Sequence, residues 1–198
     1  MTANMEMFQQ FAQNLAHLGE GAKQVQMSDA ERVSAAKETF IRKLDGRMAV
    51  DLESCIHCGH CASACHFYTG TEDPKYVPIR KLDLLKRVYR RDLSPMRWLH
   101  RLYTDDITVK DLQAWQELVY DSCTECGRCS MVCPMGINIA SMVNVMRQGM
   151  ARAGMMPAEL MAMEQEQGGR DSLFGVGPEQ MKGAITKLQE SGLDIPLD

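Results

Sequence analysis

Apolar side chains recur every three to four residues in several segments of the chain, which is the spacing of helices with one buried face. No segment shows the alternation of apolar and polar residues that is typical of a strand. Ser28 and Glu31 form the pattern of a capping box, and Asp111 follows Thr108 at the same spacing. The sequence therefore predicts a mainly α fold with helices at residues 2–19, 28–45, 79–91, 94–102, 109–119, 137–153 and 178–191.

The predicted helix 137–153 carries a row of methionines. Met142, Met146 and Met150 follow one another at intervals of four residues, so they lie on one helical face. We interpret this face as part of the core, with an adaptable partner-binding surface as the alternative. Between the helices, the Gly, Asp and Pro residues of segment 68–78 predict an irregular loop.

The composition is that of an ordinary globular protein, with 45% hydrophobic and 24% charged residues among 198. The formal net charge of −4 argues against a general attraction to nucleic acid or to an anionic membrane. No apolar run is long enough to span a bilayer, and the first residues lack the basic start and apolar stretch of a secretion signal. We therefore expect a cytoplasmic protein.

All eight cysteines fall into two runs of the form CxxCxxCxxxC, which is the ligand pattern of bacterial-type [4Fe–4S] clusters. Two four-cysteine zinc sites are the main alternative, but zinc usually takes two separated CxxC pairs. Four disulfides are a weaker alternative, because the spacing is regular and no export signal is present. The runs are Cys55, Cys58, Cys61 and Cys65, and Cys123, Cys126, Cys129 and Cys133.

In proteins with two such clusters, the fourth cysteine of each run ligates the other cluster. On that rule the first cluster takes Cys55, Cys58, Cys61 and Cys133, and the second takes Cys123, Cys126, Cys129 and Cys65. Gly59 and Gly127 occupy the same position in the two runs, where glycine lets the chain stay close to the inorganic core. Each oxidised cluster adds a charge of about −2, which brings the protein to about −8.

Three histidines lie in or beside the first run. Pro134 follows the second run as the pattern expects, but His66 stands at that place in the first. We expect His66, His57 and His60 to tune the clusters through hydrogen bonds and charge, since four cysteines per cluster leave no need for a histidine ligand.

Residues 80–101 contain eight Lys or Arg against two Asp. A solvated helix face is the simplest interpretation of this basic segment. It could instead dock an acidic partner or offset the charge of the clusters. No Gly-rich nucleotide loop and no nucleophile motif accompanies it, so the sequence predicts no substrate site and leaves open whether the chain is an enzyme by itself.

Two segments, ESCIHCGHCASACHFYTGTEDPKYVPIRKLDLLKRVYRRD at 53–92 and DSCTECGRCSMVCPMGINIA at 121–140, resemble the dicluster ferredoxin module of the heterodisulfide reductase family. That family includes the C subunit, the N-terminal part of the D subunit, the K subunit associated with dissimilatory sulfite reductase, and related complexes of sulfur oxidisers. The phrase after the first run particularly resembles the sulfur-metabolism branches.

The resemblance covers roughly residues 50–150 and implies an α-helical ferredoxin fold. We expect this domain at residues 50–153, between a helical N-terminal arm at 1–49 and a helical C-terminal arm at 154–198. The resemblance also implies two [4Fe–4S] clusters and a relay of single electrons in a hetero-oligomer. The partners would be a flavin-bearing, iron–sulfur A subunit and a disulfide-active B subunit with a CCG motif, which this chain lacks. The alternatives are the relay of a quinone-linked anaerobic dehydrogenase of the glycerol-3-phosphate or lactate type, and a zinc-stapled interaction module.

Overall fold

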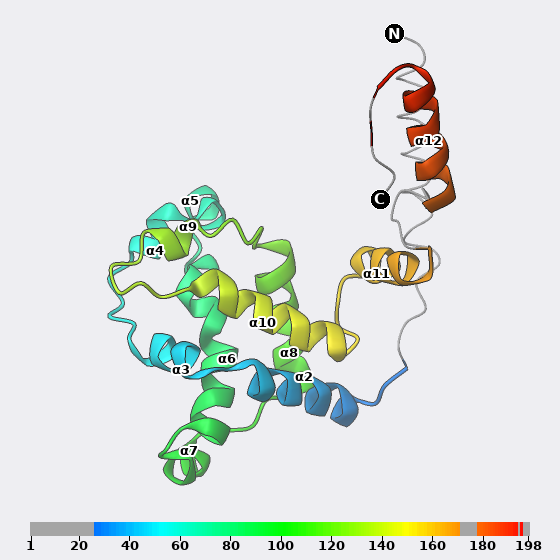
Figure 1. The fold of residues 1–198 in the computed structure, drawn as a ribbon. Helices are drawn as coiled ribbons and strands as arrows, with labels where there is room; N and C mark the ends of the chain where they lie inside the picture. The colour runs from blue at the N-terminus through cyan, green and yellow to red at the C-terminus, as the bar shows by residue number, and fades with distance from the viewer. Residues whose placement is uncertain (1–25, 171–177, 194, 196–198) are drawn as a thin grey trace. The chain divides into compact units, whose positions relative to one another are not determined.

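A computed structural model of the chain describes residues 26–170, 178–193 and 195, and these residues are mainly helical with no strand (Figure 1). The prediction of a mainly α fold is confirmed. The predicted helix 2–19 lies outside the described residues. The chain divides into two compact units, one of which spans Val25–Met156 and contains all eight cysteines.

Short helices build the cysteine-bearing unit. They are α2 (Asp29–Lys43), α3 (Gly46–Glu53), α4 (His60–Ala64), α5 (His66–Thr71), α6 (Asp83–Val88), α7 (Arg97–Tyr103), α8 (Val109–Gln116), α9 (Arg128–Met131) and α10 (Ile139–Arg152). The other unit contains α11 (Ala158–Arg170) and α12 (Pro178–Glu190). The predicted domain limits at residues 50 and 153 stay a prediction, and the compact unit begins earlier because α2 packs along α10.

Both predicted capping boxes are present. The Ser28 side chain accepts a hydrogen bond from the Glu31 amide at the start of α2, and Thr108 does the same with Asp111 at α8. Asp45 caps a further helix, α3, which the sequence analysis did not predict. Segment 68–78 is also more regular than expected.

The predicted loop 68–78 is largely helical. The helix α5 ends at Thr71, and 3-10 helices follow at Pro74–Tyr76 and Pro78–Leu82. The Asp73 side chain accepts a hydrogen bond from the Lys75 amide and so caps the first of these 3-10 helices, and Pro74 is its first residue. Asp and Pro are typical of loops, but they are also favoured at the start of a helix. The predicted helices 79–91 and 109–119 contain α6 and α8, and each continues into a π-helical turn, at Tyr89–Leu93 and Glu117–Asp121.

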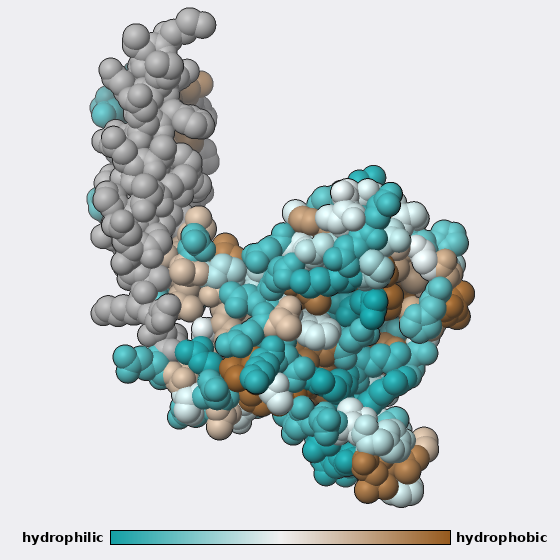
Figure 2. Space-filling view, turned by 180° about the vertical axis from the view of Figure 1, so that it is seen from behind, coloured by the Kyte–Doolittle hydropathy of each residue, from teal (hydrophilic) through white to brown (hydrophobic). Residues whose placement is uncertain are grey.

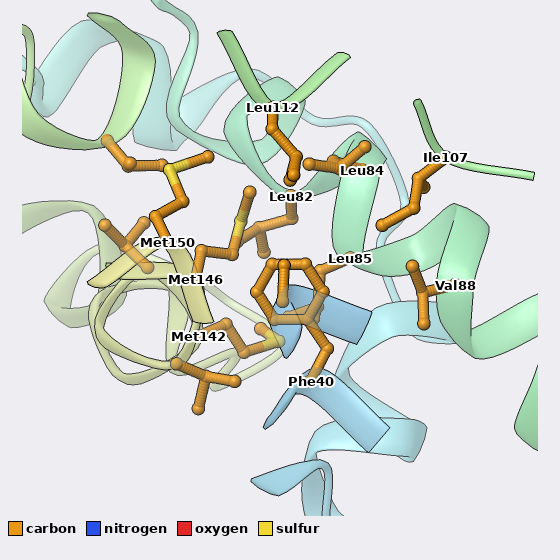
Figure 3. Close-up of a cluster of buried hydrophobic side chains, with 14 of the residues drawn as sticks. Phe40, Leu82, Leu84, Leu85, Val88, Ile107, Leu112, Met142, Met146 and Met150 are labelled. Atoms are coloured by element: carbon orange, nitrogen blue, oxygen red, sulfur yellow. The ribbon is translucent and has the colours of Figure 1, made fainter. Parts of the chain in front are cut away.

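The methionine row of α10 belongs to the core, as predicted. Met142, Met146 and Met150 are fully buried, and Figure 3 shows the first two beside the ring of Phe40 from α2. Gly149 makes this approach of α2 and α10 possible, because a Cβ atom there would lie 2.2 Å from Phe40 Cε1. Leucines from the segment around α6 close the core from the other side.

Much of the basic segment is neutralised within the unit. The ion pairs are Lys86 and Arg90 with Glu53, Arg87 with Asp111, Arg91 with Asp106, and Arg101 with Asp92. The segment is therefore not a continuous free basic face. Lys81 differs from all of these residues, because its side chain is buried.

Candidate metal centres

The two cysteine runs fold into loops with the same backbone conformation. Gly59 and Gly127 have φ values of 81° and 76°, and the third residue of each run, His57 or Glu125, also has a positive φ, of 54° or 53°. Such alternation between left-handed and right-handed backbone turns successive N–H groups to one side and makes a concave site for an anion. A short helix, α4 or α9, begins directly after the glycine.

The first cavity takes cysteines from both runs. Three of its four thiols come from the first run and one from the second, and its remaining wall is mainly apolar, with Val77, Ile79 and Ile137. The four cysteines that line the cavity are Cys55, Cys58, Cys61 and Cys133.

The second cavity shows the reverse combination. Here three thiols come from the second run and one from the first, beside Phe67, Pro78 and Val143. The four cysteines that line it are Cys123, Cys126, Cys129 and Cys65. These groupings describe the lining of the two cavities, and the ligands of each cluster stay a prediction.

One short segment forms a wall of both cavities. Within and beside the 3-10 helix Pro78–Leu82, Ile79 and Arg80 line the first cavity, whereas Pro78 and Lys81 line the second. Ile139, at the start of α10, lines both. Part of the long interval between the two runs therefore builds the partition between the cavities, a role that its apolar periodicity did not indicate.

The predicted histidines are placed differently from one another. His57 lines the first cavity, His66 lines the second next to the ring of Phe67, and His60 is exposed at the start of α4. His66 thus accompanies Cys65 to the cavity of the other run. Their hydrogen bonds to the clusters stay a prediction.

The donor set fits two iron–sulfur clusters. Each cavity brings four soft thiol ligands to a concave, largely apolar pocket, which is the ligand chemistry of a [4Fe–4S] centre. Burial raises the pKa of the Cys61 and Cys129 thiols, so cluster binding has to release their protons. Cys58 and Cys126, by contrast, are exposed, although they also line the cavities.

An arginine of α10 holds the second loop, and sequence reasoning missed it. Arg147 donates hydrogen bonds to the carbonyl oxygens of Val119, at 2.7 Å, and Cys123, and it forms an ion pair of 3.3 Å with Glu125. The Tyr120 hydroxyl donates to the Arg147 carbonyl oxygen at 2.9 Å. One side chain thereby contacts the π-helical turn and both the first cysteine and the positive-φ residue of the second run.

We expect Arg147→Ala to loosen the second loop selectively. Hydrogen bonds from a charged group contribute about 2 kcal/mol, and the Val119 and Cys123 carbonyls would lose their donor. In the presence of a chelator, the variant should release iron from the second cluster several times faster than the wild type does. The loss of each cluster's EPR signal over time measures this rate. Arg152→Ala, an exposed arginine on the same helix, is the control. Equal release from both clusters would contradict the prediction.

The helical fold, the two repeated loops and the two four-thiol cavities define an iron–sulfur protein with two clusters. The family comparison agrees, since residues 51–137 match the family described as "4Fe-4S dicluster domain". The chain therefore carries a 4Fe-4S dicluster domain that binds two [4Fe–4S] clusters, and it is similar to iron–sulfur electron-transfer subunits of heterodisulfide-reductase-like oxidoreductases. The zinc and disulfide alternatives are not supported.

Three curated relatives illustrate the similarity. The "Hdr-like menaquinol oxidoreductase iron-sulfur subunit 2" of Archaeoglobus fulgidus is 30% identical over 82% of this chain and 30% of its own length. The corresponding iron–sulfur subunit of Archaeoglobus profundus is 32% identical over 60% of this chain and 21% of its own length. The D subunit of the dihydromethanophenazine:CoB--CoM heterodisulfide reductase of Methanosarcina barkeri is 24% identical over 59% of this chain and 28% of its own length.

The chain spans less than a third of the length of each of these relatives. No solved structure matches the chain significantly. The comparisons thus identify the dicluster domain and its relatives, and the resemblance stated from the cysteine segments is confirmed.

Proposed function

We propose that this chain relays single electrons between cofactors of partner subunits, with the first cluster held by Cys55, Cys58, Cys61 and Cys133 and the second by Cys123, Cys126, Cys129 and Cys65. The observation that carries this proposal is that each cavity combines three thiols of one run with one thiol of the other. When bound, the clusters supply one-electron redox chemistry. The chain's own part is to hold both of them in neighbouring cavities.

The partition between the cavities supports the relay. Ile139 and the 3-10 helix Pro78–Leu82 are common to both sites, so only a thin layer of side chains separates the two sets of thiols. A short separation favours exchange of an electron within the chain. The exposure of Cys58 and Cys126 brings one cysteine of each cavity to the surface, where a partner cofactor can approach.

For the partners, we propose a heterodisulfide-reductase-like complex of sulfur metabolism, with a flavin and iron–sulfur A subunit and a CCG-type B subunit. The Methanosarcina relative is named as a subunit of a heterodisulfide reductase, which supports this class. The 198 residues contain no Cys-Cys pair, and we propose that the CCG-type B subunit carries the disulfide chemistry. A cytoplasmic location stays a prediction.

A quinone-linked relay is the second candidate, because two relatives are named as subunits of menaquinol oxidoreductases. Among the described residues, no helix is both long enough and apolar enough to cross a membrane. On this alternative a partner would carry the quinone site, and this chain would pass electrons to or from it.

A hetero-oligomer is supported by the surface around α7. Met96, Trp98, Leu102 and Tyr103 are all more than half exposed, and Figure 2 shows apolar surface at this end of the unit. Aromatic residues and methionine are enriched in protein interfaces. We propose that a partner subunit covers this surface.

Anaerobic purification with the natural neighbours tests the proposed function. The isolated chain should be brown and contain about eight iron atoms, four for each cluster. Dithionite should bleach it and produce EPR signals of two reduced clusters. A co-purifying flavoprotein and CCG protein would support the first candidate, and a quinol-reactive partner the second. A colourless, zinc-containing protein would contradict both.

A further inference from the structure

Lys81 is a buried lysine in the wall of the second cavity. Its relative exposure is only 2%, although it lies in the most basic segment of the chain. Lysine is rarely buried to this degree, because the ammonium group loses its hydration. Its position beside Cys65, Cys123 and Cys129 therefore needs a physical explanation.

The ammonium group is held in place by neutral partners. Lys81 Nζ donates hydrogen bonds to the carbonyl oxygen and, at 3.0 Å, to the hydroxyl of Ser122, which directly precedes Cys123. It also lies 5.5 Å from the centre of the Phe67 ring, and the Trp115 indole donates to the Lys81 carbonyl at 2.8 Å. Ser122 accounts for two of the three ammonium hydrogens, which leaves one donor for the cavity.

No acidic side chain forms an ion pair with Lys81 among the residues that the structure describes. The pKa of Glu117 is lowered first by hydrogen bonds from Lys75 and Tyr76 and then by nearby charges that include Lys81, so this carboxylate is already paired. Glu125, the one carboxylate lining the cavity, pairs with Arg147. Burial lowers the pKa of Lys81, because the ammonium group loses its hydration. An anionic cluster held by the thiols of this cavity would place an opposite charge beside the buried ammonium.

The first cavity has no comparable group. Arg80 is the one lysine or arginine that lines the first cavity, and it is exposed to solvent. A charge in water is screened, whereas a buried charge acts through a medium of low dielectric constant and interacts much more strongly at the same distance. Neighbouring residues of one 3-10 helix thus give the two cavities different electrostatic environments.

We propose that the buried ammonium of Lys81 raises the reduction potential of the second cluster above that of the first, so that a single electron on this protein rests at the second cluster. This inference depends on the ligand sets of the proposed function. Reduction adds one negative charge to a cluster, and a fixed positive charge next to it stabilises the reduced form more than the oxidised form. Lys81 is in this sense a tuning residue, not a ligand.

Redox titration of Lys81→Met, followed by EPR, tests the proposal. Methionine keeps the length of the side chain and removes its charge. The potential of the second cluster should fall, and the equilibrium constant for electron transfer from the first cluster to the second should drop at least about tenfold, which is about 59 mV for a one-electron couple. The EPR signals are assigned to the clusters with Cys58→Ser and Cys126→Ser.

Arg80→Met is the matched control, since it removes the same charge one residue earlier, on the exposed side. It should leave the potential of the second cluster unchanged, and Lys81→Arg should keep that potential close to the wild-type value. An unchanged second potential in Lys81→Met, or the same shift in Arg80→Met, would overturn the proposal.

Lys81→Gln separates the charge from the structural role, because glutamine retains an amide donor for Ser122. The same downward shift is expected if Lys81→Met assembles poorly. Loss of the second cluster from both variants would assign Lys81 a purely structural role and overturn the proposal. Failure of the proposed ligand sets is distinct, because Cys65→Ser would then damage the first cluster and spare the second, whatever the effect of Lys81→Met.

Discussion

Replacing Cys65 with serine is expected to damage the second cluster and spare the first, although Cys65 belongs to the first cysteine run. The reason is positional, because Cys65 lines the cavity of Cys123, Cys126 and Cys129, whose sequence positions lie nearly 60 residues further on. Serine replaces a thiolate ligand with a much poorer donor for iron. If the second cluster is lost, the iron content should fall from about eight to about four atoms per chain. If it is retained in a damaged form, its EPR signal should change while that of the first cluster does not.

The reciprocal variant and a neighbour provide the controls. Cys133→Ser should damage the first cluster, because Cys133 lines the cavity of Cys55, Cys58 and Cys61. Cys61→Ser, four residues before Cys65, should damage the first cluster as well. EPR of the reduced proteins distinguishes these outcomes. If Cys65→Ser lost the first cluster and kept the second, the ligand assignment would be wrong.

The sequence alone was sufficient for the local features of the site. Cysteine spacing gave the number and type of clusters, and the capping boxes at Ser28 and Thr108 gave the starts of two helices. These features depend on residues that are close together in the chain. The methionine row of α10 was equally accessible, because helical periodicity reports which face is buried.

The residues that sequence reasoning missed act across long sequence distances. Lys81 contacts Ser122, 41 residues away, and Arg147 contacts Cys123, 24 residues away. A lysine in a basic segment is expected in solvent, and nothing local distinguishes Lys81 from Arg80. Only the packing of the 3-10 helix between the two cavities separates them.

The interval between the runs shows the same limit. The Gly, Asp and Pro residues of 68–78 predict a loop, whereas the chain there forms α5 and two 3-10 helices. Short helices of this kind are stabilised by their tertiary neighbours more than by local preference. At the end of this segment and one residue beyond it, Val77 and Ile79 line the first cavity, and Pro78 lines the second.

Phe40→Ala is expected to cause the largest loss of stability among single core variants. The ring is fully buried between α2 and α10, and truncation of a buried phenylalanine costs about 3 to 5 kcal/mol. The free energy of unfolding can be measured anaerobically by denaturant titration with circular dichroism. Leu102→Ala is the control, because this side chain is 76% exposed and its removal should change stability little.

Gly149 of α10 lies against the Phe40 ring, so a substitution there tests the same contact. Gly149→Ala alone should also destabilise, since the new Cβ would lie 2.2 Å from Phe40 Cε1 and overpacking costs about 1 to 3 kcal/mol. In the double variant the alanine methyl at 149 occupies space that the ring has left. The combined loss should therefore be smaller than the sum of the two single losses. Simple additivity would show that the contact between α2 and α10 does not depend on this ring and this glycine.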